Sequence, residues 1–126
     1  MAYPGSNKKV RFYKSVGFAL AGIKASFRER NMKIHATAAI LVILVGIFFS
    51  ISKTEWLWIL LCVAGMFSLE MVNTAIEKTV DLVTGEYHPL AKAAKDLAAG
   101  AVLIYTVYSI IVGMVVFLPK VFNFFF

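Results

Sequence analysis

The sequence predicts an all-α integral membrane protein, a helical bundle with three transmembrane helices and one amphipathic surface helix per chain. Three observations support this class. Hydrophobic residues make up 60% of the 126 residues and the mean hydropathy is +0.80, whereas soluble domains are about 45–50% apolar. Most apolar residues fall in three long runs. Lysine and arginine gather on one side of the membrane that these runs define.

Composition also limits the architecture of this single membrane domain, residues 1–126. The one cysteine, Cys62, lies inside an apolar run, so no intrachain disulfide can form and the residue is expected to be a small buried hydrophobe. One short chain encloses little space among a few helices, which favours an oligomer with sites between subunits. Residues 1–9 are polar and do not resemble a cleaved signal peptide, and we expect them to be mobile.

Residues 10–30 are predicted to form the surface helix. Apolar side chains recur there at helical spacing, and basic side chains occupy much of the remaining surface. The apolar positions are Phe12, Val16, Leu20, Ile23 and Phe27. A basic amphipathic helix of low overall hydrophobicity lies in the membrane interface and does not cross it. Because no separate soluble domain is present to carry a nucleic-acid site, we expect no nucleic-acid partner.

Three membrane helices are predicted at residues 34–51, 56–83 and 91–118. At about 1.5 Å per residue, the first just covers a hydrocarbon core of roughly 30 Å. A very short turn over residues 52–55 makes the second helix return antiparallel to the first. The second and third helices are expected to extend into the cytoplasm, because polar residues continue both of them at the same end. Pro119 is expected to close the third.

Positive charge orients this bundle in the membrane. The segment before the first span carries most of the lysine and arginine, and the loop between the second and third spans and its flanks carry Lys78, Lys92 and Lys95. The opposite side has only Lys53 and Lys120. The positive-inside rule therefore predicts that the N-terminus and the second loop are cytoplasmic.

The chain is organised around the polar end of the second membrane helix. At about 100° per residue, one helical face carries Glu70, Asn73, Thr74, Glu77 and Asp81. The carboxylates on this face repel one another unless a cation or a proton lies among them. Glu70 lies where lipid makes an ionised group costly by about 2.5 kcal/mol or more, and an intramembrane carboxylate indicates a functional site.

The predicted topology brings further charged residues, Glu29, Lys92, Lys95 and Asp96, to the same cytoplasmic level. Carboxylate and amide oxygens suit a hard cation such as Mg²⁺, and lysines suit phosphate. Phosphoryl transfer depends mainly on positioning and charge neutralisation by such groups. A carboxylate at lipid depth could in addition take a proton from an alcohol whose tail stays in the bilayer. No P-loop pattern is present, so a conventional nucleotide-binding fold is not predicted.

These residues also have purely structural interpretations. The charged residues at positions 77–81 could form an ordinary solvated helix end, and Lys92 and Asp96 could form a salt bridge at a helix start. Four ring-bearing residues are expected to be packing or turn residues, namely His35, His88, Tyr105 and Tyr108. Glu70 is the residue for which a structural interpretation is weakest.

Two linked motifs resemble the small bacterial diacylglycerol kinase family. The first is Glu70-x-x-Asn-Thr-Ala-Ile-Glu77-x-x-Val-Asp81, and the second is Glu86-Tyr-His-Pro-Leu-Ala-Lys-x-Ala-Lys95-Asp96. The sequence at residues 88–102 is most similar to the Gram-positive branch, the undecaprenol kinases. The resemblance covers nearly the whole chain, from about Arg11 to Lys120.

This resemblance implies a homotrimeric kinase of the bacterial inner (plasma) membrane, with cytoplasmic active sites shared between subunits, that uses ATP and Mg²⁺. It implies that Glu70 is the general base for the lipid hydroxyl and that Asn73 positions the reacting groups. Glu29 and Glu77 would hold the metal. Four further residues would contact the nucleotide or its phosphates, namely Arg11, Lys14, Lys95 and Asp96.

We therefore predict an ATP-dependent kinase that phosphorylates the membrane-embedded lipid alcohol undecaprenol to undecaprenyl phosphate. The alternative is a diacylglycerol kinase that makes phosphatidic acid. The chain departs from the diacylglycerol enzymes at Phe18, where they have tyrosine, and at Ala21, where they have lysine. A small proton-coupled exporter could use Glu70 as its proton site, although it would need no carboxylate–lysine cluster. A structural assembly subunit would need neither Glu70 nor Glu77.

Overall fold

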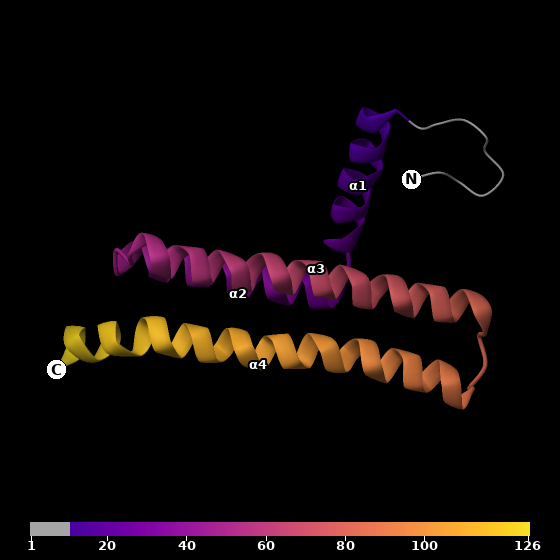
Figure 1. Ribbon diagram of the computed structural model, residues 1–126. Helices are drawn as coiled ribbons and strands as arrows, with labels where there is room; N and C mark the ends of the chain where they lie inside the picture. Colours follow the sequence, from indigo (N-terminus) through magenta and orange to yellow (C-terminus); the bar gives the residue numbers. More distant parts are fainter. Residues whose placement is uncertain (1–10) are drawn as a thin grey trace.

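The computed structural model of this protein describes residues 11–126, which form four helices and no strand. The helices are α1 (Phe12–Ser26), α2 (Arg30–Phe48), α3 (Lys53–Val83) and α4 (Pro89–Phe125). In Figure 1, α2, α3 and α4 run along one axis, and α1 stands across them where it joins the start of α2. The three long helices are apolar enough to cross a membrane. The predicted all-α bundle of three membrane helices preceded by a shorter helix is therefore confirmed.

Helix α3 is the element against which the rest of the described chain packs. It contacts α4 most extensively, then α2, and also α1. Its buried residues follow one stripe at helical spacing, namely Ile59, Cys62, Met66, Glu70 and Asn73. The apolar part of the buried face thus passes directly into the two polar residues. This continuity carries Glu70 and Asn73 into the interior of the bundle, and Cys62 is buried as expected.

Several helix boundaries differ from the sequence prediction. Helix α1 ends at Ser26, whereas the prediction extended to residue 30, and α2 begins at Arg30, whereas the predicted span began at residue 34. Hydropathy marks where a helix enters the bilayer, but a helix begins where its backbone turns, and charged residues can occupy its first turns. The predicted helix start at Val10 and the segment at residues 1–9 lie outside the described residues.

The predicted end of the third span at Pro119 is wrong, because α4 continues through this proline to Phe125. A proline removes one helical hydrogen bond, but neighbouring helices can compensate for that loss. Beyond Pro119, Lys120 Nζ lies 3.1 Å from Glu55 Oε1. The ring of Phe124 lies 5.7 Å from that of Phe48 and 6.1 Å from that of Phe49. These tertiary contacts hold the last turns of α4 against the α2–α3 turn.

The short turn between α2 and α3 reverses the chain. Ser50 adopts φ 49° and donates its N–H to Ile47 O at 3.1 Å, and Ile51 N donates to Gly46 O at 3.2 Å. This pattern is a Schellman motif with serine at the left-handed position. Ser52 then begins α3 with a capping box, in which it exchanges side-chain hydrogen bonds with Glu55. These hydrogen bonds satisfy backbone groups of the turn that makes α3 run antiparallel to α2, as predicted.

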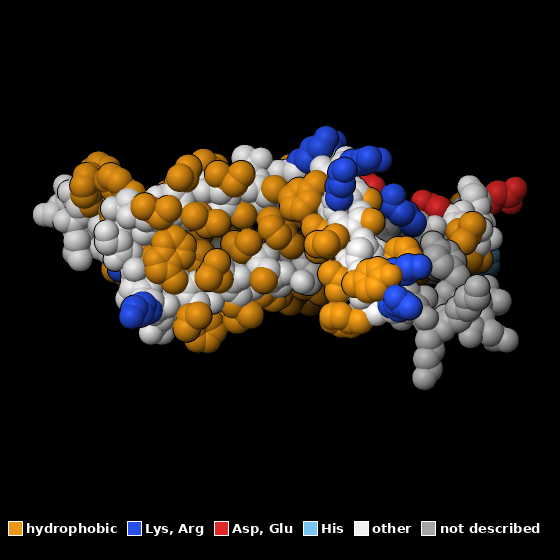
Figure 2. All heavy atoms as spheres, turned by 90° about the horizontal axis from the view of Figure 1, so that it is seen from above, with side chains coloured by type: hydrophobic (Ala, Val, Ile, Leu, Met, Phe, Trp, Pro, Cys, Tyr) orange, Lys and Arg blue, Asp and Glu red, His pale blue; other side chains and the backbone are white. Residues whose placement is uncertain are grey.

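Most of the apolar surface of the bundle is exposed in the single chain. Figure 2 shows apolar side chains along the bundle, lysine and arginine side chains gathered beside α1, and acidic side chains toward the α3–α4 loop. Only 6% of the residues in the most apolar stretch of α4 are buried within the chain. Lipid or another protein must cover such a surface.

Gly65 allows α3 and α4 to approach closely, which leads to a stability prediction. A Cβ at Gly65 would lie 2.0 Å from Tyr105 Oη, which donates a hydrogen bond to Leu61 O at 2.7 Å. We expect Gly65→Val to lower the free energy of unfolding by about 1–3 kcal/mol, because the tyrosine ring must leave its site. Thermal unfolding in detergent measures this change.

Gly22→Val provides the matched control for this prediction, because nothing lies within 4 Å of the Cβ position at Gly22. The double variant Gly65→Val/Tyr105→Ala should recover part of the loss. Equal unfolding temperatures for Gly65→Val and Gly22→Val would contradict the close contact between α3 and α4.

Candidate functional site

The first group of the candidate site is a carboxylate inside the membrane bundle. Glu70 in α3 is 2% exposed. Its Oε2 lies 3.7 Å from Nε2 of His35, one turn into α2. This distance fits an electrostatic contact and is longer than a hydrogen bond. A carboxylate placed this deeply matches the predicted functional position and is well placed to exchange a proton away from bulk water.

The next group along the same face of α3 is a polar pair. Asn73 is 5% exposed, and its Nδ2 donates a hydrogen bond to Glu77 Oε1 at 3.2 Å. The Oδ1 atom of Asn73 is buried and accepts no hydrogen bond from any described residue. A buried acceptor without a partner costs free energy, about 1–3 kcal/mol. The buried oxygen of Asn73 is therefore an acceptor without a described partner on the same helix face as Glu77.

A second acidic residue reaches this region from the junction of α1 and α2. Glu29 is the N-cap residue of α2, and its Oε1 lies 3.0 Å from Nζ of Lys78 in α3. The Glu29 side chain is 40% exposed, so this ion pair is solvated and contributes little to stability. A weak pair of this kind can exchange for another cation at low cost.

The polar ends of α3 and α4 line a cavity of about 280 Å³, and one ion pair joins them there. Lys95 Nζ lies 2.5 Å from Asp81 Oδ1, and this contact links the two helices. Lys92 Nζ lies 2.5 Å from Asp96 Oδ2 one turn away, so the structure contains the salt bridge that was the structural alternative for these two residues. All four residues line the cavity. Lys95 and Asp96 therefore line one cavity, and their roles toward phosphate and nucleoside stay predictions.

The two basic residues predicted to contact the nucleotide lie apart from these ion pairs. Arg11 is the N-cap residue of α1 and Lys14 lies in its first turn, and both are exposed. Among residues 11–126, no ion pair joins either of them to an acidic residue. The predicted nucleotide contacts of Arg11 and Lys14 therefore stay predictions.

The oxygen donors of this region suit Mg²⁺ in combination with other ligands. Within the described chain, no three His, Cys, Asp or Glu side chains gather closely enough to hold a metal by themselves. Mg²⁺ does not need such a cage, because one or two carboxylates together with phosphate oxygens and waters usually hold it. Glu29, Glu77 and the unpaired Asn73 Oδ1 provide oxygen donors of this kind. The donor set therefore fits Mg²⁺ bound together with a phosphorylated substrate.

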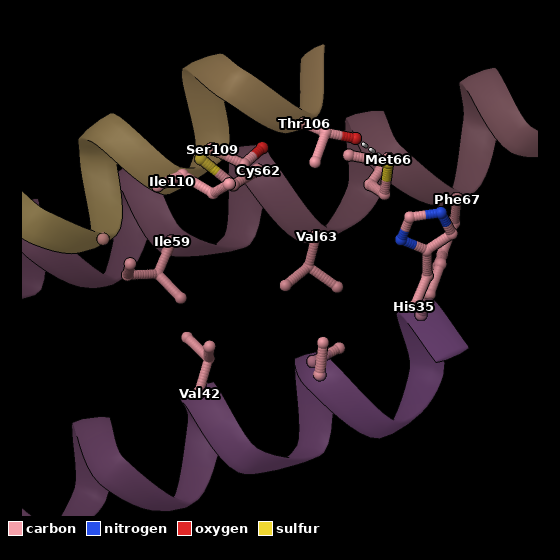
Figure 3. Close-up of a pocket in the computed structure, with 13 residues that line it drawn as sticks. His35, Val42, Ile59, Cys62, Val63, Met66, Phe67, Thr106, Ser109 and Ile110 are labelled. Carbon is pink, nitrogen blue, oxygen red and sulfur yellow. Dashed lines mark hydrogen bonds between the residues drawn. The ribbon is translucent and has the colours of Figure 1, made fainter. Parts of the chain in front are cut away.

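An apolar cleft of about 270 Å³ lies between α2, α3 and α4, and we call it the membrane cleft. Representative lining residues are His35, Val42, Ile59, Met66, Thr106 and Ile110. Figure 3 shows His35 at one end of the membrane cleft and Val42 and Ile59 toward the other. Because His35 also contacts Glu70, the apolar cleft ends beside the buried carboxylate. The arrangement can hold an apolar chain and present its polar end to Glu70.

The contact between His35 and Glu70 was not predicted, since His35 was interpreted as a packing or turn residue. The two residues lie on different helices, and no local spacing relates them. A signal was nevertheless available, because His35 is a titratable residue inside an otherwise apolar predicted span. Tyr105 and Tyr108 pack together with ring centroids 5.6 Å apart, as expected of helix-packing aromatics.

Comparison with known proteins adds independent findings. The profile of a family described as prokaryotic diacylglycerol kinase matches residues 17–117. The undecaprenol kinase of Bacillus subtilis (strain 168) is 53% identical over 115 residues, which cover 90% of this chain and 94% of that protein. The diacylglycerol kinase of Synechocystis sp. is 35% identical over 127 residues, covering 92% of this chain and 73% of that protein. The diacylglycerol kinase of Escherichia coli (strain K12) is 28% identical over 102 residues, covering 80% and 84%.

Proposed function

Because this chain belongs to the prokaryotic diacylglycerol kinase family and is therefore a membrane lipid kinase, we propose that it transfers the γ-phosphoryl group of ATP to the hydroxyl of undecaprenol. The product would be undecaprenyl phosphate. The substrate assignment follows the undecaprenol kinase of Bacillus subtilis, which is 53% identical. Diacylglycerol is the second candidate, because other relatives are diacylglycerol kinases.

The observation that carries this proposal is the position of Glu70 beside the end of the membrane cleft. The tail of a lipid alcohol fits an apolar cleft between membrane helices, and its hydroxyl would then reach the buried carboxylate. Glu70 would accept the hydroxyl proton as general base. The alcohol oxygen would then form a bond to the γ-phosphorus, while the bond from this phosphorus to the bridging oxygen breaks and ADP leaves. Burial of Glu70 keeps water away from this position and so favours the lipid alcohol as acceptor.

A group of polar and charged residues, which we call the polar rim, is assigned to the nucleotide and the metal. It consists of Glu29, Asn73, Glu77, Lys95 and Asp96. Glu29 and Glu77 would hold Mg²⁺, which supplies charge neutralisation at the phosphates. Asn73 would position the reacting groups through the carbonyl oxygen that has no partner in the described chain. Lys95 would exchange Asp81 for a phosphate oxygen, and Asp96 would orient the neighbouring groups or the nucleoside.

The charge of α1 supports further nucleotide contacts. Arg11, the N-cap residue of α1, and Lys14, in its first turn, are assigned to the nucleotide by the family resemblance. We place α1 in the cytoplasmic interface of the bacterial inner membrane, because its basic residues gain about 1 kcal/mol each near anionic headgroups. The N-terminus and the site are then cytoplasmic.

We further propose a homotrimer with sites shared between subunits. Few residues of the apolar stretch of α4 are buried within one chain, and Arg11 and Lys14 form no ion pair with an acidic residue of the described chain. Association would cover α4 and could bring the basic residues of one subunit to the acidic residues of the next. Cross-linking in native membranes tests the subunit number.

The lipid substrate is tested with purified protein in vesicles that contain radiolabelled ATP, Mg²⁺ and either undecaprenol or diacylglycerol. We expect the kcat/KM for undecaprenol to be at least about tenfold higher than the kcat/KM for diacylglycerol. This ratio corresponds to about 1.4 kcal/mol in transition-state binding. A vesicle without an added alcohol measures background hydrolysis. Phosphorylation of diacylglycerol alone would refute the undecaprenol assignment and leave lipid kinase activity intact.

A further inference from the structure

The buried carboxylate of Glu70 has one ion-pair partner in the described chain, the imidazole of His35. Nε2 of His35 faces Oε2 of Glu70 at 3.7 Å, and the two side chains are 20% and 3% exposed. We propose that His35 is a positioning residue that holds the Glu70 carboxylate in the orientation needed to accept the lipid proton. This inference rests on the proposed role of Glu70 as the general base.

The cost of burying Glu70 supports this role. An ionised carboxylate at membrane depth is unfavourable unless a donor or a positive charge faces it. No hydrogen bond is formed at 3.7 Å, but catalytic contacts are often long without substrate and tighten when it binds. The contact uses Oε2, and within the described residues Oε1 has no ion pair or hydrogen bond. His35 would therefore orient one oxygen and leave the other to take the proton.

Two lysines of the region are paired with other carboxylates in the structure. Lys78 contacts Glu29, and Lys95 contacts Asp81. Both lysines lie further along the helices toward the polar rim. His35 also lines the end of the membrane cleft. The imidazole thus lies between the space for the lipid tail and the base, where it can act on Glu70 while substrate is bound.

His35 neither gains nor loses a proton in the proposed chemical step. The O–H bond of the lipid alcohol breaks and its proton passes to Oε1 of Glu70. The alcohol oxygen forms a bond to the γ-phosphorus, while the bond from that phosphorus to the bridging oxygen breaks and ADP leaves. His35 touches neither the phosphorus nor the leaving group in this scheme, so it acts through Glu70.

A double-mutant cycle in the full-length protein tests this coupling, with His35→Leu, Glu70→Gln and the double variant compared with wild type in the vesicle assay. We expect His35→Leu to lower kcat by about 10–100-fold, as is typical when a group that orients a functional ligand is lost, with little change in KM for the lipid. In the Glu70→Gln background, the His35 substitution should have no further effect, because residues that act as a unit are non-additive. His35→Gln, which keeps an N–H donor, should recover part of the loss.

Thr37→Val is the matched control, because Thr37 is exposed on the same helix and donates only to Lys33 O. Equal losses from the His35 substitution in both Glu70 backgrounds, or a change confined to KM, would overturn the proposal. Glu70→Asp, which withdraws the carboxylate from His35, replaces Glu70→Gln if the turnover of the latter falls below detection. If His35→Leu does not fold, His35→Gln completes the cycle. Unchanged turnover in Glu70→Gln would instead refute the proposed role of Glu70 as base.

Discussion

Glu70→Gln should lower lipid phosphorylation by about 10²–10⁴-fold, because it removes the general base and keeps the shape of the side chain. The variant should still bind ATP with Mg²⁺, since the rim residues assigned to the nucleotide are unchanged. Turnover with labelled ATP and nucleotide binding by equilibrium dialysis measure the two properties separately. Loss of turnover with retained binding is the pattern expected of a kinase base.

Other outcomes distinguish the competing functions. An exporter that uses Glu70 as its proton site would show no ATP binding even in the wild-type protein. A structural subunit would show no effect of Glu70→Gln on any turnover. Glu55→Gln is the matched control, because Glu55 lies at the opposite end of α3, in its first turn, and a glutamine oxygen can still accept the hydrogen bond from Ser52 N. Its turnover should equal that of wild type.

Glu77→Gln should raise the Mg²⁺ concentration needed for half-maximal turnover and lower kcat by about 10²-fold or more, the usual cost of removing one electrostatic contact to a developing charge. The amide oxygen of a glutamine can still accept the hydrogen bond from Asn73 Nδ2. The substitution therefore removes charge with little change in packing. Titration of activity with Mg²⁺ measures the effect.

Glu29→Gln should also raise the Mg²⁺ requirement and lower kcat, because the carboxylates of Glu29 and Glu77 are assigned to one metal. The structure pairs Glu29 with Lys78, so the loss of that weak surface ion pair must be separated from the loss of a metal ligand. Lys78→Met breaks the ion pair and keeps the carboxylate, and its Mg²⁺ requirement should not rise. A Mg²⁺ dependence that is unchanged in Glu29→Gln and Glu77→Gln would contradict the assigned metal site.

Much of the fold could be predicted because it depends on local patterns. Three long apolar runs, a short turn and a basic amphipathic segment predicted the number and type of helices, and the structure confirms them. The helix at Pro119 was mispredicted, because its continuation depends on contacts of Lys120 and Phe124 with residues far away in the chain. Local propensity carries no information about such contacts.

The sequence by itself determined which residue types share one face of α3, because helical spacing alone aligns Glu70, Asn73 and Glu77. It also carried the motifs by which the family was predicted. Only the tertiary structure decided which partners these residues meet, namely His35 for Glu70, Lys78 for Glu29 and Lys95 for Asp81. Each pair joins two different helices, so its distance is set by how those helices pack and by no spacing within either one.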